Sequence, residues 1–117
     1  MTSMRVTIPA QVPYQEITLW LDFYSQLLTP RTREVLELHY NEDMSLSEIA
    51  EHIGITRQGV HDKIIKGVAQ LSGYETSLGL AKRFLDQKKL IAHAIEELDA
   101  GQVLRARQIL ADLYDAL

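Results

Sequence analysis

The sequence contains no cysteine, which excludes disulfide bonds, thiolate catalysis and cysteine-ligated zinc. It also lacks a long hydrophobic run, since no stretch approaches the ~18 uninterrupted apolar residues of a membrane-spanning helix. Residues 1–13 hold one basic residue, Arg5, and no apolar segment of the kind that a signal peptide requires. We therefore expect a cytoplasmic protein without a membrane segment.

Sequence patterns that carry catalysis or cofactor binding are also missing. The four histidines are far apart and fit no metal-ligand spacing. The six glycines are scattered singly, and none belongs to a phosphate-binding loop. The acidic pairs Glu42–Asp43 and Glu96–Glu97 fall near predicted helix ends, where exposed carboxylates need no catalytic explanation. We expect no enzyme activity, no metal and no cofactor.

An excess of positive charge is the third feature that the sequence lacks. The formal net charge is −4. Affinity for nucleic acid depends largely on cations that neutralise phosphates, and a DNA-binding domain usually carries a basic patch. Residues 29–74 hold five basic side chains against seven acidic ones. Contact with nucleic acid must therefore depend on the local placement of a few cations, and protein partners stay open.

The rest of the composition is that of a globular protein. The chain has 117 residues, of which 46 % are hydrophobic and 24 % charged, and this length predicts one domain. Residues 1–13 contain Pro9 and Pro13 without any periodic pattern, so we predict a flexible N-terminal arm. Residues 14–117 are predicted to form a single helical domain, since they show neither strand-like alternation nor repeats.

Apolar residues recur at steps of three and four from Tyr14 to Leu28, which predicts a first helix. This stripe consists of Ile17, Trp20, Leu21, Tyr24, Leu27 and Leu28. Leu19 and Phe23 lie outside the stripe, so the helix is apolar on two sides. Such a helix is either enclosed by the protein or shared with a partner.

Two capping signals follow. Thr29 before Pro30 predicts the start of a helix that ends near Asn41. Its inward residues are expected to be Val35, Leu36, His39 and Tyr40. Ser45, with Glu48 three residues later, has the spacing of a capping box, in which each side chain accepts a hydrogen bond from a backbone N–H of the first turn.

Residues 45–72 have the pattern of a helix-turn-helix. Ala50 is small where the two helices of the motif must cross closely, Gly54 permits a left-handed turn, and Ile55 fills that turn. Thr56 is the expected cap of the second helix. The apolar face of this second helix consists of Val60, Ile64, Val68 and Leu71. Two helices joined by a short glycine turn define the motif. An ordinary α-hairpin without a ligand is the alternative.

If the second helix of the motif reads nucleic acid, its outward side chains near the N-terminus make the base contacts. Arg57 and Gln58 suit guanine and adenine edges, and His61 lies on the same face. Phosphate contacts are expected from Thr56, Lys63, Lys66, Arg31 and Arg33. Asp62 lies on the reading face and would repel phosphate. The alternative for the whole set is a solvated helix face.

The helical pattern continues over about residues 74–117. A first seam of apolar residues has the alternating steps of three and four typical of a coiled coil. It consists of Ala81, Phe84, Ile91, Ile95 and Leu98, with Lys88 as its one polar member. After a break at Asp99–Gly101, a second seam consists of Val103, Ala106, Leu110, Leu113 and Leu117. The two seams predict an αα-hairpin, which packs either within one subunit or against the second subunit of a homodimer.

Six segments form a recognisable combination, namely residues 21–24, 28–29, 36–38, 40–50, 56–62 and 73–75. This combination resembles the YlxM family of small bacterial proteins, whose helix-turn-helix is similar to region four of sigma factors. The resemblance covers about residues 17–85. The chain departs from the family at three positions of the second helix, because Gly59 replaces the usual alanine, His61 the usual tyrosine and Lys63 the usual asparagine.

The resemblance implies an all-α fold, with a sigma-region-four-like helix-turn-helix core, an N-terminal helix and a C-terminal αα-hairpin. It also implies a dimer and a role beside the signal recognition particle, because the family's gene usually neighbours that of the particle's GTPase. Three functions stay open. They are a regulator or accessory of the signal recognition particle pathway, a DNA-binding transcriptional regulator, and a dimeric protein-interaction module without a nucleic-acid ligand. DNA, the particle's RNA and protein all stay open as partners.

Overall fold

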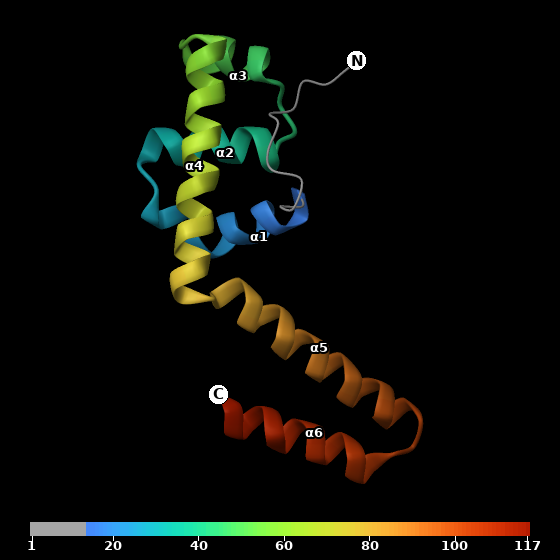
Figure 1. Cartoon of the computed structure of the whole chain (residues 1–117). Helices are drawn as coiled ribbons and strands as arrows, with labels where there is room; N and C mark the ends of the chain where they lie inside the picture. The colour runs from blue at the N-terminus through green and yellow to red at the C-terminus, as the bar shows by residue number, and fades with distance from the viewer. Residues whose placement is uncertain (1–13) are drawn as a thin grey trace. The chain divides into compact units, whose positions relative to one another are not determined.

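The computed structural model describes residues 14–117, and the arm predicted over residues 1–13 lies outside the described residues. The described residues form six α-helices and one short 3-10 helix, with no strand among them (Figure 1). The predicted all-α class is confirmed. The chain divides into two compact units, Met1–Gly79 and Leu80–Leu117, which are described separately. That residues 14–117 form a single domain stays a prediction.

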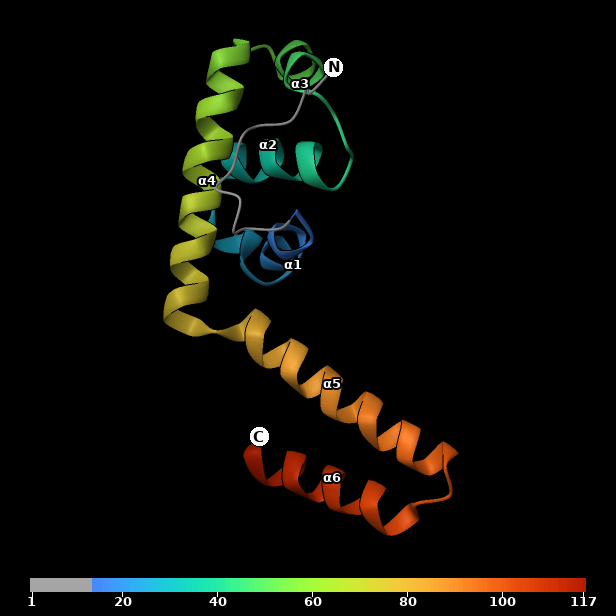
Figure 2. The ribbon, with the colours of Figure 1, turned by 45° about the vertical axis from the view of Figure 1, so that its right-hand side comes forward.

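The first unit is organised around one long helix. Its elements are α1 (Tyr14–Tyr24), η1 (Ser25–Leu27), α2 (Pro30–Tyr40), α3 (Leu46–Ile53) and α4 (Arg57–Leu78). Both ribbon views show α1, α2 and α3 arranged along the length of α4, and each of the three contacts it (Figures 1 and 2). The core of the unit therefore lies between α4 and these three shorter helices.

The apolar stripe of α1 packs into this core, with one exception. Ile17, Trp20, Leu21 and Tyr24 are buried as predicted, and so is Leu28. Leu27, however, is 52 % exposed. The α-helix ends at Tyr24 and the chain continues as the 3-10 helix η1, whose three residues per turn rotate the next side chains out of the α-helical stripe. The prediction was therefore wrong for Leu27.

The predicted bounds of α2 are confirmed. Thr29 is the N-cap, its Oγ1 accepting a hydrogen bond from the backbone N–H of Thr32, and Asn41 is the C-cap. The four residues expected to face inward are all buried. His39 is only 3 % exposed, and its Nδ1 lies 2.9 Å from the carbonyl oxygen of Met44. The ring thus has a hydrogen-bond partner inside the core.

The predicted helix-turn-helix is present as α3, a turn and the first half of α4. Ser45 and Glu48 form both hydrogen bonds of the capping box at the start of α3. Gly54 ends α3 with a φ of 78°, a left-handed conformation that costs glycine little. Thr56 caps α4. The predicted apolar face of α4 is buried against the core.

The second helix of the motif is longer than predicted. The sequence pattern placed its end near residue 72, whereas α4 extends to Leu78 and ends at Gly79, which has a φ of 63°. Gly73 does not interrupt the helix. An exposed glycine lowers helix stability by only ~1 kcal/mol relative to alanine, which tertiary contacts readily offset.

The second unit is the predicted αα-hairpin. It consists of α5 (Leu80–Asp99) and α6 (Val103–Ala116), which run antiparallel on either side of a turn at Gly101 (Figure 2). The buried apolar side chains of this unit are Ala81, Ala94, Ala106 and Leu113. Most of the predicted seam residues are exposed, among them Ile91, Ile95 and Leu98. The interior of the hairpin is therefore built largely from small residues.

Candidate nucleic-acid interface

The N-terminal end of α4 brings together the three residues predicted to read bases. Arg57, Gln58 and His61 line one groove, together with Leu46 from the start of α3. Arg57 and Gln58 belong to the first turn of α4 and are exposed. Thr56 holds this turn in place, since its Oγ1 accepts a hydrogen bond of 2.9 Å from the backbone N–H of Gly59. The groove thus lies where α3 and α4 meet.

Leu46 is the one residue of this groove that the sequence did not assign to the site. Its side chain is 6 % exposed and belongs mainly to the core of the helix-turn-helix. The capping box at Ser45 fixes where α3 starts, and therefore fixes Leu46 beside the first turns of α4. The only signal in the sequence for the position of Leu46 is the capping box, which starts α3 close to the turn of the same motif.

Gln58 is oriented by its neighbour one turn later. Its Nε2 donates a hydrogen bond of 2.9 Å to Oδ1 of Asp62. A primary amide carries two N–H donors and a carbonyl oxygen, so one donor and the acceptor of Gln58 remain for other contacts. These are the two groups that a bidentate contact with adenine uses. The negative charge of Asp62 would repel a phosphate, but its carboxylate also fixes the orientation of the Gln58 amide.

His61 lines the same groove, and its ring is partly exposed. Its Nδ1 is buried without a hydrogen-bond partner and lies 3.7 Å from Oδ1 of Asp62. The side chain as a whole is 41 % exposed, so the outer part of the ring is the part that solvent reaches. The ring edge that carries Nε2 is accordingly the part of His61 able to contact a ligand.

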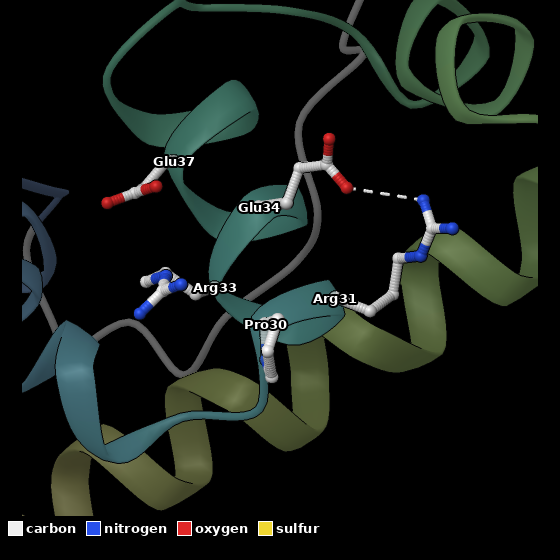
Figure 3. A pocket seen from close by; sticks show the side chains of 5 residues that line it. All are labelled: Pro30, Arg31, Arg33, Glu34 and Glu37. Carbon is white, nitrogen blue, oxygen red and sulfur yellow. Dashed lines mark hydrogen bonds and ion pairs between the residues drawn. The ribbon is translucent and has the colours of Figure 1, made fainter.

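The two predicted arginines of α2 line a separate shallow pocket (Figure 3). Its other lining residues are Pro30, Glu34 and Glu37. Nη1 of Arg31 forms an ion pair of 3.2 Å with Oε1 of Glu34, and both side chains are about half exposed. Nη1 of Arg33 donates to Oε1 of Gln26, also at 3.2 Å. Each guanidinium keeps further N–H groups, but the two glutamates offset much of the positive charge.

The lysines of α4 line neither the groove at Arg57 nor the pocket at Arg31. Lys66 is exposed and Lys63 is half-buried. Lys66 precedes Gly67, where α2 crosses α4 so closely that a Cβ at residue 67 would lie 2.6 Å from Cδ1 of Leu36. The crossing joins the first turns of α2, which carry Arg31, to the middle of α4. The structure therefore brings Arg57, Gln58 and His61 together at one end of α4 and Arg31 and Arg33 together on α2, while the two lysines line neither place.

Neither a metal site nor a membrane-spanning helix is found in the part of the chain that the structure describes. No group of three or more potential ligands among residues 14–117 is arranged to hold a metal ion. No helix among them is both long and apolar enough to cross a bilayer.

A capped and buried two-helix motif, with polar side chains gathered at the exposed start of its second helix, defines a helix-turn-helix protein. The chain belongs to the UPF0122 family, the YlxM / p13-like helix-turn-helix proteins, whose family model matches residues 14–113. The resemblance noted from the sequence is thereby confirmed. The match also extends beyond residue 85 and includes most of the C-terminal hairpin.

Individual relatives support the same assignment. A UPF0122 protein of Acetivibrio thermocellus is 49 % identical over 83 residues, which cover 71 % of each chain. One from Desulforamulus reducens is 42 % identical over 86 residues, or 74 % of each chain. One from Symbiobacterium thermophilum is 40 % identical over 99 residues, which cover 85 % of this chain and 92 % of the relative.

Proposed function

We propose that this protein is a non-enzymatic regulator or accessory of the signal recognition particle pathway that binds nucleic acid through the first turns of α4. The observation that carries the proposal is the convergence of Arg57, Gln58 and His61 on one groove. In a helix-turn-helix, the N-terminal residues of the second helix make the base contacts. Membership of the YlxM / p13-like family supports the pathway, and such a role belongs in the cytoplasm.

Each polar residue of the groove has a chemistry suited to this function. The guanidinium of Arg57 offers paired donors to a guanine edge, and Gln58 keeps one donor and one acceptor after its bond to Asp62. His61 presents its ring edge beside them. Thr56, Lys63, Lys66, Arg31 and Arg33 are the proposed phosphate contacts. Few cations take part, so we expect modest affinity that depends strongly on which of them is removed.

The test is a titration of labelled duplex DNA, and separately of signal recognition particle RNA, over a range of salt concentrations. If about four phosphates are neutralised, the logarithm of affinity falls against the logarithm of salt with a slope of about −3 to −4. Arg57→Ala should weaken binding by ~10-fold or more, as expected for the loss of a bidentate base contact. Lys66→Ala should weaken it less and make the slope shallower by about one.

Lys82→Ala is the matched control, because Lys82 is a 77 %-exposed cation on the second unit, outside both groups of proposed contacts. It should leave affinity and slope nearly unchanged. Tighter binding of the RNA supports the role beside the particle, whereas tighter, sequence-dependent binding of DNA supports the alternative of a transcriptional regulator. The absence of salt-sensitive binding to either ligand contradicts both.

A second candidate function is that of a dimeric protein-interaction module without a nucleic-acid ligand. The observation that favours it is the combination of net negative charge with exposed apolar side chains on α5 and α6. A second copy of this chain is the partner that we propose for either function. Whether the protein binds nucleic acid and whether it dimerises are separate questions with separate measurements.

A further inference from the structure

The second unit, Leu80–Leu117, buries too little apolar surface to account for its stability alone. It has fewer residues than the ~40 below which isolated domains usually need cross-links or oligomerisation. Its four buried apolar side chains include three alanines. Most of the large apolar side chains that are exposed among residues 14–117 belong to this unit. The hairpin therefore requires a further apolar surface to pack against.

Three exposed apolar residues in the second half of α5 form one strip. Ile91, Ile95 and Leu98 are 44 %, 53 % and 48 % exposed. At 3.6 residues per turn, these three side chains fall within an arc of about 60°. The side of α5 that faces α6 is marked by the buried Ala94. Measured around the axis of α5, the centre of the strip lies ~70° from Ala94. The rotation from Ala94 to the strip has the same sense as the rotation from one residue of the helix to the next.

Helix α6 repeats this arrangement. Val103, Leu110 and Tyr114 are 61 %, 43 % and 77 % exposed, and they fall within an arc of about 40°. The centre of this arc lies again ~70° from the buried side, marked by Ala106 and Leu113, and again in the direction of increasing residue number.

Because α5 and α6 are antiparallel, equal rotations in the same sense bring the two strips to the same side of the hairpin. Together they form one surface, which we call the apolar face. It is defined by Ile91, Ile95, Leu98, Val103, Leu110 and Tyr114. Two antiparallel helices with such a face are one half of a four-helix bundle.

The charges beside the apolar face indicate what covers it. The stretch Lys82–Lys89 carries four cations and one carboxylate, whereas Ala94–Asp99 carries three carboxylates and no cation. Lys88 and Asp99 are exposed, and helix geometry places them ~50° and ~70° from the centre of the α5 strip, on the flank that is turned away from α6. Helix α5 is thus basic in its first half and acidic in its second half.

This charge order is self-complementary when two copies of α5 run antiparallel. A two-fold axis between residues 93 and 94 brings Lys88 opposite Asp99 of the partner subunit, and the symmetry repeats the pair on the other side of the axis. Flanking charges of this kind set the orientation of helix pairs.

We propose that the apolar face of the C-terminal hairpin packs against the same face of a second copy, with α5 antiparallel to α5 of the partner, forming a symmetric four-helix bundle. The inference rests on the homodimer proposed above and specifies its interface and orientation. It does not depend on whether α4 binds nucleic acid.

The first test measures the mass of the full chain by sedimentation equilibrium at micromolar concentration, without nucleic acid. The expected result is twice the monomer mass of 13.3 kDa. Ile95→Glu places a charge in the centre of the apolar face and should weaken association by at least 100-fold. Leu104→Glu is the control, because Leu104 is 83 % exposed and lies outside both strips, and this variant should remain a dimer.

The second test reverses the charges, because Ile95→Glu also removes apolar surface from the hairpin. Lys88→Glu brings two carboxylates together at each Lys88–Asp99 pair, and Asp99→Lys brings two ammonium groups together there. Each variant should weaken association by ~10-fold or more, because the symmetry repeats the pair. Both changes in one chain restore complementarity and the original net charge, and should restore the dimer. Circular dichroism at the same concentrations checks that helicity is retained.

The outcomes separate the claims. A monomer under all conditions overturns both this interface and the homodimer. A dimer that ignores Ile95→Glu, or whose charge-reversal variants are not rescued by their combination, overturns this interface and leaves the homodimer standing. Neither result bears on the salt-dependent titration of DNA and RNA, which tests the proposed function separately.

Discussion

The hydroxyl of Tyr24 donates a hydrogen bond of 2.6 Å to Oε1 of Glu75 and so joins the end of α1 to the last turns of α4. The two residues are 51 positions apart in the chain. Next to them, Tyr74 packs its ring against that of Tyr24 and donates a hydrogen bond to the carbonyl oxygen of Leu27. These contacts hold the part of α4 that extends beyond the helix-turn-helix.

Tyr24→Phe removes this hydrogen bond while keeping the buried ring, which is only 1 % exposed. We expect the free energy of unfolding of the first unit to fall by about 1.5–3 kcal/mol, the range for hydrogen bonds to charged groups. Urea unfolding followed by the fluorescence of Trp20, the single tryptophan, measures it. Tyr114→Phe removes a hydroxyl from the second unit and should leave the unfolding of the first unit unchanged, and an equal effect of both variants would refute the role of Glu75.

Two of the three glycines of α4, Gly67 and Gly73, should respond in opposite directions to the same substitution. A Cβ at Gly67 would lie 2.6 Å from Cδ1 of Leu36 and 3.0 Å from Cγ2 of Thr32. Gly67→Ala should therefore destabilise the protein by about 1–3 kcal/mol through overpacking of the α2–α4 crossing. Gly73 has open space at the same position, and Gly73→Ala should stabilise by about 0.5–1 kcal/mol through helix propensity.

Urea unfolding monitored by Trp20 fluorescence distinguishes the two variants. If both alanines stabilise the protein, α2 and α4 are not in close contact at Gly67. If both destabilise it, α4 does not continue as a regular helix through Gly73.

The capping box should make the stability of α3 depend on pH. The backbone N–H of Ser45 donates a hydrogen bond of 2.8 Å to the carboxylate of Glu48. This bond, followed by the one with the Ser45 side chain, lowers the pKa of Glu48 below its ordinary value of 4.5. A lowered pKa means that the contribution to stability is complete above that ordinary value. It is lost as the pH falls through the pKa of the folded protein.

The measurement compares the parent protein with Glu48→Ala by urea unfolding between pH 7 and about pH 3. The difference in unfolding free energy should be constant near neutral pH and should shrink at acidic pH, where Glu48 becomes protonated in the folded protein as well. A difference that stays constant down to the lowest pH would show that the charge of Glu48 contributes nothing.

Asp62 should limit affinity for nucleic acid. Asp62→Asn removes a negative charge from the reading face but keeps an oxygen that accepts the hydrogen bond from Gln58. We expect binding to tighten by about two- to five-fold, the range for a single exposed charge. Asp86→Asn, on the second unit, is the matched control and should have no effect on affinity. Weaker binding by Asp62→Asn would mean that the carboxylate itself contacts the ligand.

The parts of the fold that follow local rules were predictable from the sequence. Thr29, Ser45 and Thr56 cap their helices as predicted, and Gly54 adopts the left-handed conformation expected at the end of α3. Each of these features depends on the backbone and side chains of three or four neighbouring residues. Periodicity likewise placed the buried faces of α2 and α4 correctly, because a regular helix repeats the same angle from one residue to the next.

The errors arose where contacts between distant residues decide the structure. The end of α4 was placed too early because the residues that hold its last turns, Tyr24 and Leu27, belong to another helix and a 3-10 turn. The exposure of Leu27 has the same origin, since the switch from α to 3-10 geometry leaves no mark in the apolar spacing. Leu46 was not assigned to the candidate site because the groove exists only after α3 has packed beside α4.

Binding of nucleic acid by the first turns of α4 can be followed residue by residue by recording backbone amide NMR signals during a titration with signal recognition particle RNA or duplex DNA. We expect signals of residues 56–62 to shift first, with smaller shifts around residues 31–33 and 63–66, and we expect these shifts to disappear in Arg57→Ala. Shifts confined to residues 80–117, or none with either ligand, would contradict this expectation.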